Sequence, residues 1–170
     1  MKYTSVLNSA VRATLLGFLA LGLTTTTAFA ATGTTTFNVT ANVGNTCTFG
    51  TPTNLAFNTV VPTATTVTNA TSTFTITCST GDVYTVGLGA GNGTLATETS
   101  RFMMSGANKL AYALFNDAGY STNWGFTTGG QMTQTGTSSA QTFTVYGQIS
   151  KQTAPANGNY SDIITVTVTY

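Results

Sequence analysis

Two cysteines are the residues of this sequence best suited to covalent chemistry. Cys47 and Cys78 do not form a CxxC motif, and the chain contains no histidine. A dithiol redox centre and the common zinc ligand sets are therefore not indicated. In an exported chain the two thiols would meet oxidising conditions, so we expect a single Cys47–Cys78 disulfide. Closing a loop of about 30 residues would contribute roughly 3–4 kcal/mol to stability in the chain-entropy account.

The carboxylates are the second group that could do chemistry. Asp82, Glu98, Asp117 and Asp162 are spread along the chain, and there is no histidine to serve as a general base. Asp82 and Asp117 lie beside turn residues, where aspartate commonly accepts backbone hydrogen bonds. Glu98 and Arg101 are expected to pair at the surface. A glycosidase-type carboxylate pair is the alternative that the spacing leaves open, but we expect no enzyme and no cofactor.

An aromatic group offers a different kind of site. Trp124, with Tyr120 and Phe126 nearby in the sequence, could form a platform for stacking on a sugar. Such a platform would make the protein a carbohydrate-binding module or an adhesin. The alternative is that these rings close the core of the fold or pack between subunits, as large aromatic side chains commonly do.

The composition limits the possible partners. Only 5% of the residues are charged, whereas 41% are hydrophobic. The chain lacks the clustered Lys and Arg that nucleic acids and anionic membranes require. Low charge weakens repulsion between copies, so self-association is expected.

The first 30 residues have the pattern of a secretory signal. Lys2 and Arg12 precede or flank an apolar run at 13–23, and Ala28-Phe29-Ala30 is a cleavage sequence, so the mature chain is expected to begin at Ala31. A membrane helix is the alternative, but about 11 apolar residues are fewer than the roughly 20 needed to span a bilayer. We therefore expect export and no membrane insertion after the signal is removed.

The mature chain is predicted to be all-β. Residues 34–43 alternate between apolar and polar side chains, as a strand with one buried face does. Similar alternation occurs at 71–78 and 83–88, which we predict to form a hairpin, at 110–115, which we predict to be a central strand, and at 143–149 and 163–170. Short strands separated by Gly and Asn turns favour an antiparallel β-sandwich.

Three stretches, in this order and spacing, resemble the spore coat protein U domain, the pilin domain of archaic chaperone–usher pili of the Csu type. They are FNVTANVGNTC at 37–47; YTVGL, RFMM, LAYALFND and WG between 84 and 125; and FTVYGQI, NYSD and VTVTY between 143 and 170. The resemblance implies an incomplete immunoglobulin-like antiparallel β-sandwich that is completed by a donor strand from another subunit. It also implies a periplasmic chaperone, an outer-membrane usher, and a surface fibre of many copies that serves adhesion and biofilm formation.

Under this resemblance the chain divides into a signal peptide (1–30), a donor-strand segment (31–45) and a pilin sandwich (46–170). The donor side chains would be Phe37, Val39, Ala41 and Val43, with Phe37 or Val39 in the deepest pocket. The alternative is that residues 34–43 form the first strand of their own sandwich. A tip adhesin would be expected to carry a further binding domain before the pilin domain, for which the sequence has no space. A non-fibrous coat or matrix protein is a third possibility.

Overall fold

The computed structural model describes residues 30–61, 65–127 and 129–170. The predicted signal peptide, apart from Ala30, lies outside these residues. The chain forms two units, Met1–Ala41 and Asn42–Tyr170, each of which is described by itself. Within the described ranges, no helix has the length and apolar character needed to cross a membrane.

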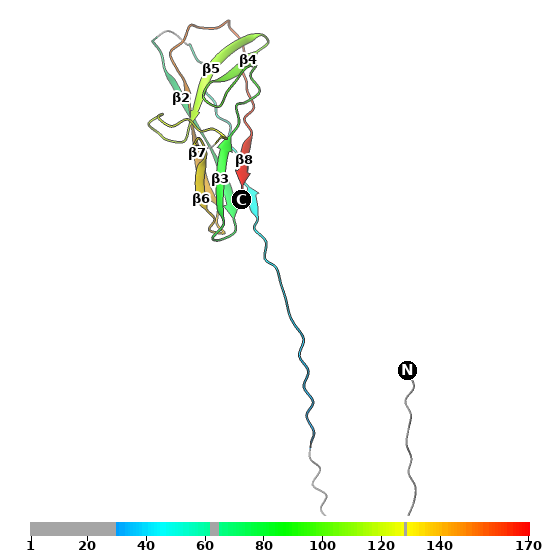
Figure 1. Cartoon of the computed structure of the whole chain (residues 1–170). Coiled ribbons are helices and arrows are strands. Elements are labelled where there is room, and N and C mark those ends of the chain that lie inside the picture. The colour runs from blue at the N-terminus through cyan, green and yellow to red at the C-terminus, as the bar shows by residue number, and fades with distance from the viewer. Residues whose placement is uncertain (1–29, 62–64, 128) are drawn as a thin grey trace, which may run out of the picture. The chain divides into compact units, whose positions relative to one another are not determined.

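The second unit is built from strands. In the described part of the chain these are β1 Cys47–Phe49, β2 Thr68–Cys78, β3 Val83–Leu88, β4 Arg101–Ser105, β5 Asn108–Phe115, β6 Met132–Thr135, β7 Gln141–Ile149 and β8 Val166–Thr169 (Figure 1). One sheet has the order β1-β2-β7-β5-β4 and the other the order β6-β3-β8, with antiparallel pairing throughout. This is an immunoglobulin-like β-sandwich, so the predicted fold class is confirmed. The prediction that 110–115 is a central strand is also confirmed, because β5 lies between β7 and β4.

The predicted hairpin of 71–78 and 83–88 is wrong. β2 and β3 are consecutive in the sequence but belong to opposite sheets. Their alternating apolar residues are buried as expected, with Ile76 on β2 and Val86 on β3 both fully inaccessible. Alternation of period 2 reveals which face of a strand is buried, but it does not reveal the pairing partner. The short connection at 79–82 therefore crosses between the two layers instead of closing a ladder.

Trp124 belongs to the core. Its side chain is 0% exposed, its ring centroid lies 5.8 Å from that of Phe74 and 6.2 Å from that of Phe143, and its Nε1 donates to the carbonyl of Val86 at 3.0 Å. The hypothesis that Trp124 forms a sugar-stacking platform is therefore wrong. Burying a ring of this size is favourable because it removes a large apolar area from water, provided that its single N–H finds a hydrogen-bond partner in the core.

The predicted surface pair of Glu98 and Arg101 is also wrong. Arg101 is 0% exposed and donates to the backbone carbonyls of Gly89, Leu88 and Trp124 at 2.8–3.0 Å, and to that of Glu98. The Glu98 carboxylate instead accepts from Thr127. A guanidinium carries several donors in one plane, so it satisfies carbonyls from several loops at once.

The Cys47–Cys78 disulfide is confirmed, with an S–S distance of 2.03 Å. The two cysteines are paired residues of β1 and β2. The bond therefore fixes the start of the sandwich to a strand whose neighbouring side chains, including Ile76, are in the core.

Two strands differ from the expectations. The sequence does not indicate β6, since Met132–Thr135 contains only a single apolar residue. The strand expected at 163–170 is shorter, at Val166–Thr169. Residues 34–43 belong to neither sheet, and their role as a donor strand for another subunit stays a prediction.

Candidate binding groove

β8 lies at the edge of its sheet: one side is bonded to β3, and no strand of the described ranges pairs with the other side. Gly89 N donates to Thr165 O at 2.9 Å, and Ser161 exchanges two hydrogen bonds with Met104 at 2.9 and 3.1 Å. In an antiparallel strand alternate residues direct their N–H and C=O groups to opposite sides. The backbone groups of Ile164, Val166 and Val168 therefore point to the open side.

The side chains of this edge alternate in the same phase. From Tyr160 to Val166 the even-numbered residues are partly buried and the odd-numbered ones are exposed, with Ile163 70% exposed. This alternation is typical of an extended chain, and it begins at Tyr160, before the first residue of β8. Its even-numbered residues present both free backbone groups and inward side chains.

The opposite wall is the segment that follows β1. Thr53 N donates to Thr73 O at 2.9 Å, which fixes the start of this segment to β2. Leu55 and Phe57 are partly buried against the core. They lie close over β7, where a Cβ added to Gly147 would be 2.8 Å from Leu55 Cδ1. Because Gly147 has no side chain, this wall can pack directly on β7.

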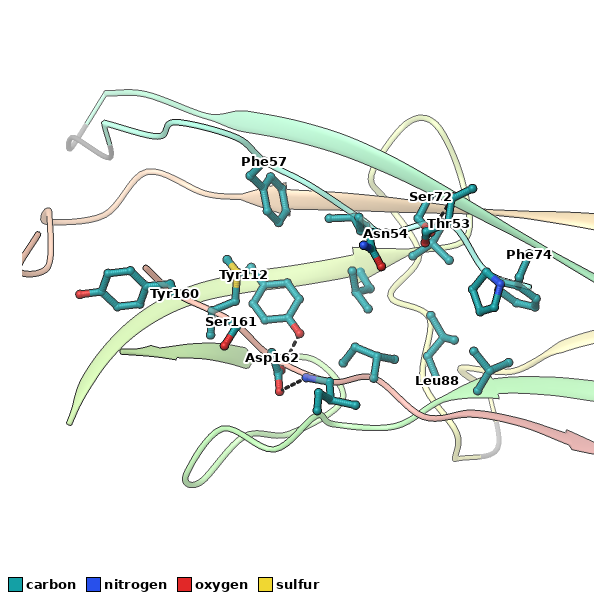
Figure 2. A pocket seen from close by; sticks show the side chains of 18 residues that line it. Thr53, Asn54, Phe57, Ser72, Phe74, Leu88, Tyr112, Tyr160, Ser161 and Asp162 are labelled. Carbon is teal, nitrogen blue, oxygen red and sulfur yellow. Dashed lines mark hydrogen bonds between the residues drawn. The ribbon is translucent and has the colours of Figure 1, made fainter. Parts of the chain in front are cut away.

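A groove with a volume of about 470 Å³ lies between the two walls (Figure 2). Its floor is the apolar core itself, with side chains from both sheets: Phe74, Leu88, Leu114 and Val145. A second cavity of about 530 Å³ continues from it and shares Leu55, Phe57, Met103 and Tyr160. The two cavities thus run along one side of the sandwich, directly above buried residues of its core.

One carboxylate lies in the groove. Asp162 accepts from the Tyr112 hydroxyl at 2.6 Å and from Ile163 N at 2.8 Å (Figure 2). It also accepts from Asn92 N at 2.7 Å. Burial and this hydrogen bond to Asp162 raise the pKa of Tyr112 well above its ordinary value. The hydroxyl therefore remains a donor at every physiological pH. The pair ties the wall that precedes β8 to β5.

No group of three or more potential metal ligands occurs among the residues that the structure describes. The groove is instead apolar on its floor and has one satisfied carboxylate at its side. Such a surface can bury alternating apolar side chains and can bond an extended backbone.

The residues predicted to form the donor strand are exposed. Phe37, Val39 and Val43 are 85%, 84% and 90% exposed, and Ala41 is also exposed. The lining of the groove could not be predicted from the sequence. Ile164, Val166 and Val168 alternate with polar residues, but alternation of period 2 does not show that one edge of that strand lacks a partner.

Residues 33–167 match the Spore Coat Protein U domain family. No curated protein is similar enough to count as a match. Among solved structures, the chain is similar to one chain of the crystal structure of the CsuC–CsuE chaperone–tip adhesion subunit pre-assembly complex from archaic chaperone–usher Csu pili of Acinetobacter baumannii. The TM-score is 0.54 at 24% identity, over 75% of this chain and 40% of that one. The chain thus spans less than half the length of that structure's chain, and the likeness establishes a shared fold. Since the family match covers most of the sequence, the protein belongs to the Spore Coat Protein U domain family.

Proposed function

We propose that this protein is a structural subunit of an archaic chaperone–usher pilus that polymerises by donor-strand complementation. Residues 31–45 of one subunit would fill the groove in the sandwich, residues 46–170, of the next. The observation that supports this most is the groove, which is lined by apolar residues of the core and bordered by the free edge of β8. A sandwich that lacks one strand needs a strand from elsewhere.

The chemistry of the groove matches the chemistry of the N-terminal segment. Added strands gain affinity from main-chain hydrogen bonds and specificity from alternate side chains that enter pockets. The edge offers the N–H and C=O groups of Ile164, Val166 and Val168. Residues Phe37, Val39, Ala41 and Val43 offer apolar side chains two positions apart, which fall on one face of an extended chain.

The free energy of binding the donor strand combines a favourable burial contribution with the cost of ordering the segment. Burying the three larger donor side chains, with a smaller contribution from Ala41, would contribute on the order of 5–10 kcal/mol. Ordering the segment costs roughly 1–2 kcal/mol per residue. The hydrogen-bond ladder along β8 must therefore contribute to a stable junction as much as the pockets do.

The ends of the sandwich favour a donor strand that is antiparallel to β8. Cys47 pairs with Cys78 at the end of β2, and Thr169 at the end of β8 pairs with Thr85 near the start of β3. Because the end of β2 and the start of β3 are joined by a short connection, β1 begins and β8 ends at the same end, or pole, of the sandwich. An antiparallel donor would leave the groove at the other pole, near Tyr160. Subunits would then join head to tail, with one incoming and one outgoing connection at separate poles. A parallel donor would leave at the pole already occupied by the acceptor's own N-terminal segment.

The same open edge explains the proposed partners. An isolated subunit exposes an apolar groove and an unpaired strand edge, both of which promote aggregation. We propose that a periplasmic chaperone covers the groove before assembly and that an outer-membrane usher exports the fibre. The structural similarity to a chain from a chaperone–subunit complex supports a chaperone partner. The fibre would serve surface adhesion and biofilm formation. The burial of Trp124 removes one platform that a sugar-binding role would have used.

The proposal is tested by expressing the chain with a chaperone and usher of the archaic class. Purified fibres should run as a ladder on unboiled denaturing gels and collapse to monomer on heating. Val39→Asp should block assembly while chaperone binding persists, because it places a carboxylate in an apolar groove. Thr40→Asp, on the other face of the same segment, is the matched control and should assemble. A stable monomer that needs no chaperone, or fibres of normal length from Val39→Asp, would contradict the proposal.

A further inference from the structure

We propose a specific register for the donor strand, in which Phe37 lies opposite Val166, Val39 opposite Ile164, Ala41 opposite Asp162 and Val43 opposite Tyr160. This inference rests on the proposed function and deepens it. Its central claim is that Ala41 of one subunit and Asp162 of the next set the register together.

The phase of the pairing follows from the hydrogen bonds of the acceptor. The even-numbered residues of the 160–166 segment direct their backbone groups to the open side and their side chains inward. Directly opposed residues of an antiparallel pair carry their side chains on the same face. The apolar, odd-numbered donor residues must therefore lie opposite even-numbered acceptor residues, and a shift by one residue would turn them away from the core.

The number of positions then restricts the register. On the β8 side the groove is lined by Tyr160, Ser161, Asp162, Ile163, Ile164 and Val166, whereas Val168 lines neither cavity. Four of these are the even-numbered residues, whose side chains are partly buried. The donor segment carries four alternate apolar residues. One antiparallel register places all four donor side chains opposite groove-lining residues. A shift by two residues in one direction places Phe37 opposite Val168, which lines neither cavity. The opposite shift places Val43 opposite Gly158, in the second cavity, and Val39 opposite Asp162.

The sizes of the side chains select the same register. Val166 is paired with Leu88, and Phe74, Leu114 and Val145 line the same groove, so an apolar lining is available for the Phe37 ring. Beside Asp162 the Tyr112 hydroxyl and the carboxylate are already bonded at 2.6 Å. The smallest donor residue, Ala41, falls there. Shifting the strand by two residues would bring Val39 or Val43 against the carboxylate, which would desolvate it without offering a hydrogen bond.

Disulfide trapping in assembled fibres tests the register. Ile164→Cys is held constant as the acceptor and is combined in turn with Phe37→Cys, Val39→Cys and Ala41→Cys as donors. Hydrogen-bonded antiparallel pairs have Cα atoms about 5.5 Å apart, within the range that a disulfide spans. A two-residue shift displaces a residue by roughly 7 Å along the strand.

We expect the Val39→Cys and Ile164→Cys pair to give most of the cross-linked product, seen as a ladder that survives boiling and disappears on reduction. Predominant cross-linking of the Phe37 or the Ala41 variant would overturn the register while leaving donor-strand assembly intact. A parallel donor in the same cavity would cross-link Ala41→Cys and so would also overturn it. A parent chain that forms no fibres with its chaperone and usher would instead refute the proposed function.

A size series at residue 41 decides the matter if the cysteine variants fail to assemble. Ala41→Gly should assemble, whereas Ala41→Leu should lose most fibre because its side chain meets Asp162 and Tyr112. Asp162→Ala in the acceptor should restore part of the assembly of Ala41→Leu. Normal fibres from Ala41→Leu in the unaltered acceptor, or no rescue by Asp162→Ala, would overturn the claim that these two residues face each other.

Discussion

Moving the donor segment to the other end of the chain should convert an assembling subunit into a stable monomer. In this variant residues 33–43 are removed from the N-terminus and placed after Tyr170, behind a turn of about four residues. Such a short turn can lead only into an antiparallel strand, since a parallel partner needs a crossover of about a dozen residues or more. The variant should therefore fold without a chaperone, remain monomeric, and melt cooperatively at a higher temperature than the subunit that lacks the segment.

The size of the effect can be worked out for one side chain. Val39→Ala in the rearranged chain removes two methyl groups from the groove, which at about 0.8 kcal/mol each weakens the fold by roughly 1.5–2 kcal/mol. For a domain of this size that corresponds to a fall in Tm of roughly 3–8 °C. Thr40→Ala removes a side chain from the outward face, so its effect should stay within about 0.5 kcal/mol.

Thermal unfolding followed by circular dichroism, with guanidinium unfolding as a second measure, distinguishes the two variants. The reasoning is refuted if Val39→Ala and Thr40→Ala lower the Tm equally, because the segment would then have no buried face. It is also refuted if a linker of about 15 residues stabilises the rearranged chain whereas the short turn does not, since that outcome indicates a parallel strand.

Three further predictions concern the sandwich and are measured by denaturant unfolding of the rearranged chain. Arg101→Met should destabilise it by about 3–5 kcal/mol, because several buried carbonyls lose their donor; a change below about 1 kcal/mol would show that water replaces the guanidinium. Cys47→Ser with Cys78→Ser should cost roughly 3–4 kcal/mol, and reduction of the parent chain should reproduce that loss while leaving the double variant unchanged. Tyr112→Phe should cost about 1.5–3 kcal/mol, since a hydrogen bond to a carboxylate is lost, and an unaltered midpoint would mean that the bond to Asp162 contributes nothing.

The sequence was sufficient for everything that depends on local pattern. Period-2 alternation located the buried faces of β2, β3, β5 and β7, because a strand with one face in the core must alternate whatever its partner is. The lone pair of cysteines in a chain with an export pattern led to the Cys47–Cys78 bond. The exposed apolar face of residues 34–43 was also visible in the sequence, although its destination entered only through the resemblance to a pilin family.

The tertiary structure alone decided which strands pair and which edge stays open. β2 and β3 separate into opposite sheets, and Arg101 turns inward, because pairing and burial depend on residues that are distant in the sequence. The groove has the same origin: its walls come from residues 52–57 and 160–166, and its floor comes from both sheets. Alternation of period 2 shows which face of a strand is apolar, whereas only the tertiary structure shows that a strand edge has no pairing partner.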